Sequence, residues 1–216
     1  MRKFTRQDKK KITLEWLAQF PSLGIYKPMW LMNRIGPLVM GVLLHVKSGN
    51  ENYTPTFHIH CLLSEFSAIT LSLNSAPLGY VTLPHHEMYF QRVIEEFKEH
   101  VFMPLEGDLN LDFIMQGYRY YLNHCKYPRK QMAYEDMVLL ASWCDAHDLR
   151  SQLLDETKKE ISAWPSDSIE KMDGIDAWVS KIDRESADRN KLQQIFEQEL
   201  VRHKLEKIPV RNIVIP

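Results

Sequence analysis

The sequence predicts an α+β fold, with an N-terminal antiparallel β-meander of three to four strands and flanking helices, followed by a helical C-terminal half. Two observations carry this prediction. Between residues 38 and 83, short apolar runs are separated by polar loops, and residues 68–74 alternate between apolar and polar, which is typical of strands. From residue 109 onward, apolar residues recur every three or four positions, which is typical of helices that bury one face.

The N-terminal half is expected to begin with a helix and to continue into strands. Ile12, Trp16 and Phe20 recur at helical spacing, and Pro21 ends the run. The polar residues 47–52 separate two apolar runs and predict a hairpin loop between strands. The elements expected in order are a helix over residues 5–20, strands over 38–46, 53–63, 68–74 and 79–83, and a helix over 86–101.

From residue 109 onward, the C-terminal half is expected to be mainly helical. Pro128 and Pro165 separate helical runs, and Ser186 is expected to cap the last helix. Asp108 or Asn110 is the expected cap of the first one. The predicted helices cover residues 109–124, 134–147, 149–163, 168–184 and 187–206.

These patterns divide the chain into an α+β unit over residues 1–108 and a helical unit over residues 109–216. Nothing between them resembles a flexible linker, so we expect the two units to pack together as one body. The last residues, 208–216, are rich in β-branched apolar side chains, and we expect them to pair with the protein's own sheet or with a partner.

The first hairpin has two chemically different faces. If Val46 pairs with Tyr53, one face of the hairpin is apolar throughout and must face the core. The other face carries His58, His60 and Gly41. A glycine inside a strand commonly marks a bulge or the close approach of another group.

His58 and His60 are the candidate metal ligands, because residues i and i+2 of a strand point the same way. Zinc or manganese is the metal that such a pair would bind, with a third ligand from His45, or from His85 and His86. This interpretation predicts a metal-dependent hydrolase or nuclease. The other interpretation is that both are polar residues on a solvated or covered face of the sheet, without a ligand.

A second candidate site combines aromatic and basic side chains, which suits a protein partner or the bases and phosphates of a nucleic acid. Trp30, in the mixed segment 26–35, is a further candidate for partner binding. The alternative is that Phe113, Tyr120 and Tyr121 face the core and the cations are solvated. The candidate partner-binding residues of this segment are Tyr118, Arg119, Tyr121, Lys126, Arg129 and Lys130.

The charges are unevenly distributed, although the formal net charge is only −1. Residues 1–60 carry a net charge of +6, and residues 135–185 carry −7. Near-neutrality excludes a generic polyanion binder, but such zones can steer a specific charged partner.

These observations favour a non-enzymatic protein that binds another protein, as an immunity-type inhibitor or an accessory subunit of a larger complex. The sequence holds no nucleophile elbow, phosphate-binding glycine loop or dinucleotide fingerprint, and no cofactor is expected apart from a metal at His58 and His60. A nucleic-acid-binding accessory protein is the remaining alternative. Three scattered cysteines and the lack of a long apolar segment predict a cytoplasmic protein without a membrane partner.

Overall fold

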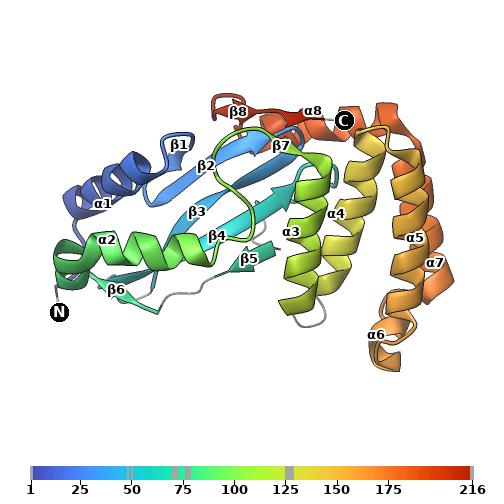
Figure 1. The fold of residues 1–216 in the computed structure, drawn as a ribbon, viewed down its shortest axis with the longest axis horizontal. Helices are drawn as coiled ribbons and strands as arrows, with labels where there is room; N and C mark the ends of the chain where they lie inside the picture. The colour runs from blue at the N-terminus through green and yellow to red at the C-terminus, as the bar shows by residue number, and fades with distance from the viewer. Residues whose placement is uncertain are drawn as a thin grey trace. The chain divides into compact units, whose positions relative to one another are not determined.

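The structure is a computed structural model that describes residues 2–47, 49, 51–69, 73–75, 79–124 and 129–214, with the backbone alone for 73–75 and 129. It confirms the predicted α+β class, because an antiparallel meander is followed by helices (Figure 1). The chain separates into two compact units. The first comprises Met1–His60, Ile69–Leu109 and Lys204–Val214, and the second comprises Cys61–Ala68, Asn110–His203 and Ile215–Pro216.

The first unit is built on a sheet whose strands follow the order β1-β2-β3-β4-β5. In addition, β6 pairs with β4, and β8 pairs in parallel with β2, while β7 and β9 form a separate pair. The C-terminal segment therefore pairs with the protein's own sheet, as expected. The strands are β1 (Gly24–Lys27), β2 (Trp30–Ile35), β3 (Leu38–Val46), β4 (Asn52–Cys61), β5 (Leu73–Ser75), β6 (Val81–Thr82), β7 (Leu109–Asn110), β8 (Val210–Arg211) and β9 (Ile213–Val214).

Two helices, α1 (Arg6–Gln19) and α2 (Leu83–Glu99), cover one face of this sheet. The Trp16 indole of α1 donates a hydrogen bond to the Tyr53 hydroxyl of β4 at 3.2 Å. The same indole packs edge-on against Phe97 of α2, with 5.2 Å between the ring centroids. These three aromatic side chains are fully buried and join both helices to the sheet.

Strands β2 and β3 approach each other closely at Gly41. A Cβ atom added at Gly41 would lie only 2.0 Å from the Leu31 carbonyl oxygen and 2.6 Å from the Met32 Cα atom. The glycine thus marks a close backbone approach, one of the two outcomes that a glycine inside a strand predicts.

The second unit is helical, and its central helix α4 contacts α3, α5, α7 and α8. The predicted helix over residues 168–184 is divided in two, because Asp173 and Gly174 adopt positive φ angles of 59° and 92°. The helices are α3 (Leu111–His124), α4 (Arg129–Trp143), α5 (His147–Ile161), α6 (Ser166–Glu170), α7 (Ile175–Ala187) and α8 (Arg189–Arg202).

The helix caps differ from the prediction in one place. Asn110 caps α3, because its side-chain oxygen accepts a 2.7 Å hydrogen bond from the Phe113 N–H, and Asp108 instead accepts hydrogen bonds from Asn212. Asp188 caps α8 by accepting from the Lys191 N–H. Ser186 does not cap α8, since it lies buried at the end of α7.

Two further predictions differ from the structure or lie outside it. The sequence predicts no strand over residues 26–35, but this segment contains the end of β1 and all of β2. Of the predicted third strand, residues 70–72 lie outside the described residues, and β5 begins at Leu73. Within the described ranges, no helix combines the length and the apolar character that a bilayer span requires.

Candidate functional site: a basic groove between α1 and β1

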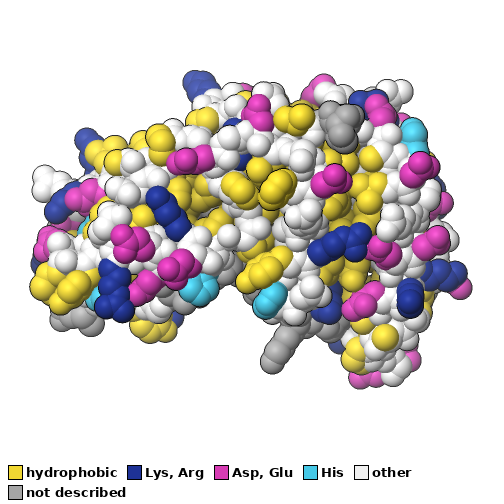
Figure 2. All heavy atoms as spheres, in the orientation of Figure 1, with side chains coloured by type: hydrophobic (Ala, Val, Ile, Leu, Met, Phe, Trp, Pro, Cys, Tyr) yellow, Lys and Arg dark blue, Asp and Glu magenta, His cyan; other side chains and the backbone are white. Residues whose placement is uncertain are grey.

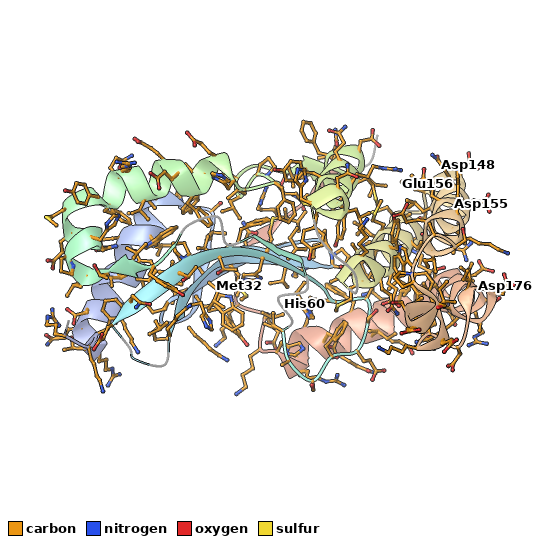
Figure 3. The ribbon with its side chains drawn as sticks, turned by 90° about the horizontal axis from the view of Figure 1, so that it is seen from below. Met32, His60, Asp148, Asp155, Glu156 and Asp176 are labelled. Atoms are coloured by element: carbon orange, nitrogen blue, oxygen red, sulfur yellow. The ribbon has the colours of Figure 1, made fainter. Side chains whose placement is uncertain are left out.

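His58 and His60 lie on the same face of β4, and both side chains are fully buried. The Trp30 indole N–H of β2 donates a 2.7 Å hydrogen bond to the Nε2 atom of His58. Because His58 and Tyr53 are an odd number of residues apart on β4, His58 lies on the face opposite α1. Figure 3 labels Met32 and His60, and both side chains lie on the side of the sheet away from α2.

The hydrogen bond from Trp30 decides the chemical state of His58. An indole N–H is a donor only, so the Nε2 atom must offer its lone pair and the proton resides on the Nδ1 atom. Burial, together with the neighbouring His60, lowers the pKa of His58 to about 3, so the ring is neutral. The lone pair that a metal ion would need is therefore already used by Trp30.

The other proposed ligands are arranged differently from what a metal site requires. His86 receives a 2.6 Å contact from the Tyr53 hydroxyl at Nδ1, and its Nε2 lies 2.8 Å from Glu15, so it belongs to the α1 side of the sheet. Across the ranges that the structure describes, no three His, Cys, Asp or Glu side chains form a group that could hold a metal ion. The described geometry thus supports the interpretation of His58 and His60 as polar residues on a covered face.

The aromatic and basic segment of α3 and α4 is largely occupied by contacts within the helical unit. Tyr118 is fully buried and donates a 3.1 Å hydrogen bond to Asp136, and Tyr121 is 5% exposed. Both phenol rings therefore face the core and are closed to a partner in this structure. The alternative that Phe113 and Tyr120 face the core is wrong, since these side chains are 55% and 51% exposed.

The basic members of this segment are partly neutralised. Arg119 pairs with Glu156 at 3.0 Å, and Lys130 pairs with Glu160 at 3.4 Å. Lys126 and the side chain of Arg129 lie outside the described residues. The segment as described therefore presents few unpaired cations to a phosphate backbone.

Trp30 differs from the other candidates because it is half-buried beside an exposed strand. The Tyr26 ring of β1 packs edge-on against the Trp30 indole at 5.2 Å. The ammonium of Lys27 lies 4.8 Å from the Tyr26 ring and 5.8 Å from the Trp30 ring. We call Tyr26, Lys27 and Trp30 the aromatic shelf, and it lies on the same face of the sheet as His58.

On the opposite face, the structure contains a groove between α1 and β1 that sequence reasoning did not identify. Its cavity volume is about 580 Å³, which is within the range of ligand-binding sites. The floor is mostly apolar, and Leu14 and Ile25 are each 46% exposed there. The lining residues are Phe4, Arg6, Lys9, Lys10, Thr13, Leu14, Ile25 and Pro28.

The shape of this groove depends on Thr13. The Thr13 hydroxyl donates to the Lys9 carbonyl at 2.6 Å and accepts a 2.9 Å hydrogen bond from the Met29 N–H. Met29 lies in the turn between β1 and β2 and has a positive φ of 68°. The threonine therefore ties the turn after β1 to α1 and sets the spacing between the two walls.

Arg6, Lys9 and Lys10 give the groove an uncompensated positive charge. No carboxylate among the described residues pairs with these three cations. The nearest acidic residue on the helix, Asp8, is already engaged, because Arg2 and Thr5 bond to its carboxylate and lower its pKa. In Figure 2, hydrophobic and Lys or Arg side chains lie next to each other at the upper left, over α1 and β1.

The position of these cations is unfavourable for the isolated helix. They lie in the first half of α1, where the positive end of the helix dipole disfavours further positive charge by a few tenths of a kcal/mol per cation. Local costs of this kind are expected at functional sites, where an anionic ligand removes them. The one sequence feature that pointed toward this groove is the net charge of +6 over residues 1–60. The net charge does not show which of the cations lie beside an apolar surface.

The acidic helices of the second unit form a different kind of surface. Asp148, Asp155 and Glu156 lie on α5 and Asp176 lies on α7, and Figure 3 labels all four. Lys158 pairs with Asp176 at 2.7 Å, and Figure 2 shows basic side chains among the acidic ones over α5 and α7. This surface is therefore a mixture of ion pairs rather than a uniform anionic face.

Neither a protein-family model, nor a curated protein, nor a solved structure was found to match the chain. The geometry of the groove and of the aromatic shelf therefore carries the functional interpretation.

Proposed function

We propose that the protein binds an acidic, partly apolar segment of another protein in the groove between α1 and β1. It would act in this way as an inhibitor of the immunity type or as an accessory subunit of a larger complex. The observation that carries the proposal is the pairing of an exposed apolar floor, Leu14 and Ile25, with three cations that no described carboxylate neutralises. This combination selects a ligand with both apolar surface and negative charge.

The composition of the groove favours a protein segment over a nucleic acid. A phosphate backbone gains from cations but gains little from an apolar floor, and base stacking requires aromatic faces that the groove lacks apart from Phe4. Phe4 itself is only 4% exposed. Glutamate side chains fit better, because their methylene groups can cover Leu14 and Ile25 while their carboxylates reach the cations.

The proposal is tested with a capped peptide of alternating glutamate and valine, about eight residues long, titrated into the isotopically labelled full chain. We expect NMR shift changes at residues of α1 and β1. We also expect binding to weaken between about 0.1 M and about 1 M salt, as the Debye length falls from about 10 Å to about 3 Å.

A charge-reversal variant provides the specific test. Lys9→Glu with Lys10→Glu removes two attractions and adds two repulsions, and we expect at least a tenfold loss of affinity for the peptide. The matched control is Lys159→Glu with Lys171→Glu, which changes the net charge equally at exposed positions outside the groove. Equal losses in the two variants, or tighter binding of a single-stranded oligonucleotide at the same groove, would contradict the proposal.

A further inference from the structure

β1 is an edge strand of the sheet. It pairs with β2 on one side, and no other described strand pairs with its outer side. In any strand, the N–H and C=O groups of alternate residues point to the same edge, so part of the backbone of β1 faces away from β2. Such an edge can accept a strand from another chain.

The two binding surfaces described above flank this edge on opposite faces of the sheet. The Ile25 side chain points into the basic groove beside α1. The Tyr26 ring contacts Trp30, whose indole bonds to His58 on the other face. Successive side chains of one short strand thus border two surfaces of different chemistry.

We infer that the acidic segment binds in an extended conformation, as a strand added to the outer edge of β1 at Ile25–Lys27. This inference rests on the proposed function and specifies how the ligand binds. Because side chains of an added strand alternate between the faces, every second one enters the groove and the others meet the aromatic shelf. The ligand sequence should therefore alternate between acidic and apolar residues.

The structure limits how far the added strand can extend. At Gly24, the Pro209 ring occupies the space beside the backbone, since an added Cβ atom would lie 2.5 Å from its Cδ atom. A bulge between Ile25 and Lys27 interrupts the pairing of β1 with β2. The Pro209 contact limits the usable edge to Ile25–Lys27, and a bulge increases the local twist of a strand, a feature of edges that avoid non-specific pairing.

Lys27 adds selectivity at this edge. Lysine on an edge strand discourages pairing with another neutral strand, because its charge would lose solvation. Lys27 therefore opposes non-specific strand pairing at this edge, while the preference for an acidic segment comes from Arg6, Lys9 and Lys10 of the groove.

Backbone N-methylation of the glutamate–valine peptide tests the inference, because each methyl group removes one N–H donor. In an added strand, alternate N–H groups point toward β1, so methylation at one set of alternate positions should weaken binding at least tenfold. Methylation at the other set should change it less than threefold. A control peptide of the same composition, with all glutamates followed by all valines, should bind at least tenfold more weakly.

Hydrogen exchange of the protein provides an independent measurement. We expect backbone amides within Ile25–Lys27 to exchange more slowly when the alternating peptide is bound, and the Tyr26→Ala variant to bind it more weakly. If methylation has no alternate pattern but the Lys9→Glu, Lys10→Glu variant still loses binding, the strand arrangement is wrong and the proposed function remains. If the peptide does not bind, or binds the charge-reversed variant equally well, the proposed function fails and the inference fails with it.

Discussion

The hydrogen bond between Trp30 and His58 determines the chemical state of a buried histidine. The bond holds the Trp30 indole between the Tyr26 ring of β1 and the buried His58 ring of β4. It also fixes the tautomer of His58, whose ring accepts the hydrogen bond at Nε2 and carries its proton on Nδ1. The two histidines on one strand face were predictable from their spacing. The hydrogen-bond donor, Trp30, was not predictable, because it lies on a strand 28 residues away in sequence.

Replacing Trp30 by phenylalanine should destabilise the protein, because the ring is kept and the donor to His58 is lost. An unsatisfied buried nitrogen costs about 1–3 kcal/mol, so we expect a loss of this size in the free energy of unfolding. Urea unfolding followed by circular dichroism measures it. Trp143→Phe is the control, since no described residue accepts a hydrogen bond from the Trp143 indole. Equal losses in both variants would mean that packing, not the hydrogen bond, sets the cost.

The buried His58 also predicts a dependence of stability on pH. Its pKa is about 3 in the folded protein against an ordinary value of 6.5, so between these values only the unfolded state binds the proton. Stability must therefore fall as the pH falls through this window, by about 1.4 kcal/mol per pH unit and roughly 4–5 kcal/mol in all. His58→Gln keeps an acceptor for Trp30 but cannot be protonated.

The test is the difference in unfolding free energy between the wild type and His58→Gln, measured by urea unfolding from neutral pH to about pH 4. Burial also raises the pKa of Asp136 and lowers the pKa of His86. Both residues are present in the wild type and in the variant, so their contributions to the pH dependence cancel in the difference. The difference should change steadily in favour of the variant as the pH falls. A constant difference would show that His58 is protonated equally in the folded and unfolded states.

At the scale of elements, the strands differ in how well their sequences reveal them. β3 was predicted with its observed bounds, because polar residues follow it and its apolar residues are continuous. β2 was missed, because its sequence WLMNRI does not alternate and the strand is buried on both faces. The groove was missed for a related reason: its apolar wall comes from β1, a four-residue strand too short to show a period.

The short strand β8 owes its place mainly to Arg211, which is 6% exposed. The guanidinium donates to the carbonyl oxygens of Glu106 at 2.8 Å and Pro104 at 3.2 Å, and also to that of Gly107. One side chain therefore satisfies three carbonyl groups of the loop that precedes β7. It joins the C-terminal segment to the sheet unit through charge-assisted hydrogen bonds.

Arg211→Ala should accordingly lower the free energy of unfolding by about 3 kcal/mol or more, since each bond to a charged group contributes about 1.5–3 kcal/mol. Urea unfolding measures the change. Arg189→Ala is a matched control, because that side chain is 59% exposed in its ion pair with Asp145 and should cost less than about 1 kcal/mol. If the two variants were equally stable, Arg211 would not hold the loop in solution.

In the whole molecule, the near-neutral net charge conceals two charged surfaces, which differ in whether their charges form ion pairs. The acidic helices of the second unit carry ion pairs such as Lys158 with Asp176. The cations of the groove have no such partners among the described residues. Counting charges along the chain located both zones, but only the structure shows which of them retains the capacity to bind an opposite charge.

The two compact units do not coincide with two continuous halves of the chain. Residues 61–68 belong to the helical unit, where the Phe66 N–H bonds to the buried carboxylate of Glu199 at 3.2 Å. Residues 204–214 belong to the sheet unit and supply β8 with its Arg211. The predicted division after residue 108 lies close to the change of unit after Leu109, but composition and periodicity do not reveal the other changes of unit, which follow His60, Ala68, His203 and Val214.

Because residues 204–214 return to the sheet unit, the structure leads to a prediction about a fragment of residues 1–108. The fragment contains most of the sheet unit but lacks the segment that pairs with β2 and satisfies the loop before β7. It also exposes Leu62 and Leu63, which are buried in the full chain. We therefore expect it to aggregate or to unfold at a lower urea concentration than the full chain.

Adding a synthetic peptide of residues 204–214 should raise the midpoint of unfolding, because the peptide binds only the folded fragment. The same peptide with Arg211→Ala should have little effect, since it cannot satisfy the three carbonyl groups. A fragment that folds equally well with either peptide, or with neither, would show that the sheet unit is complete without its C-terminal strand.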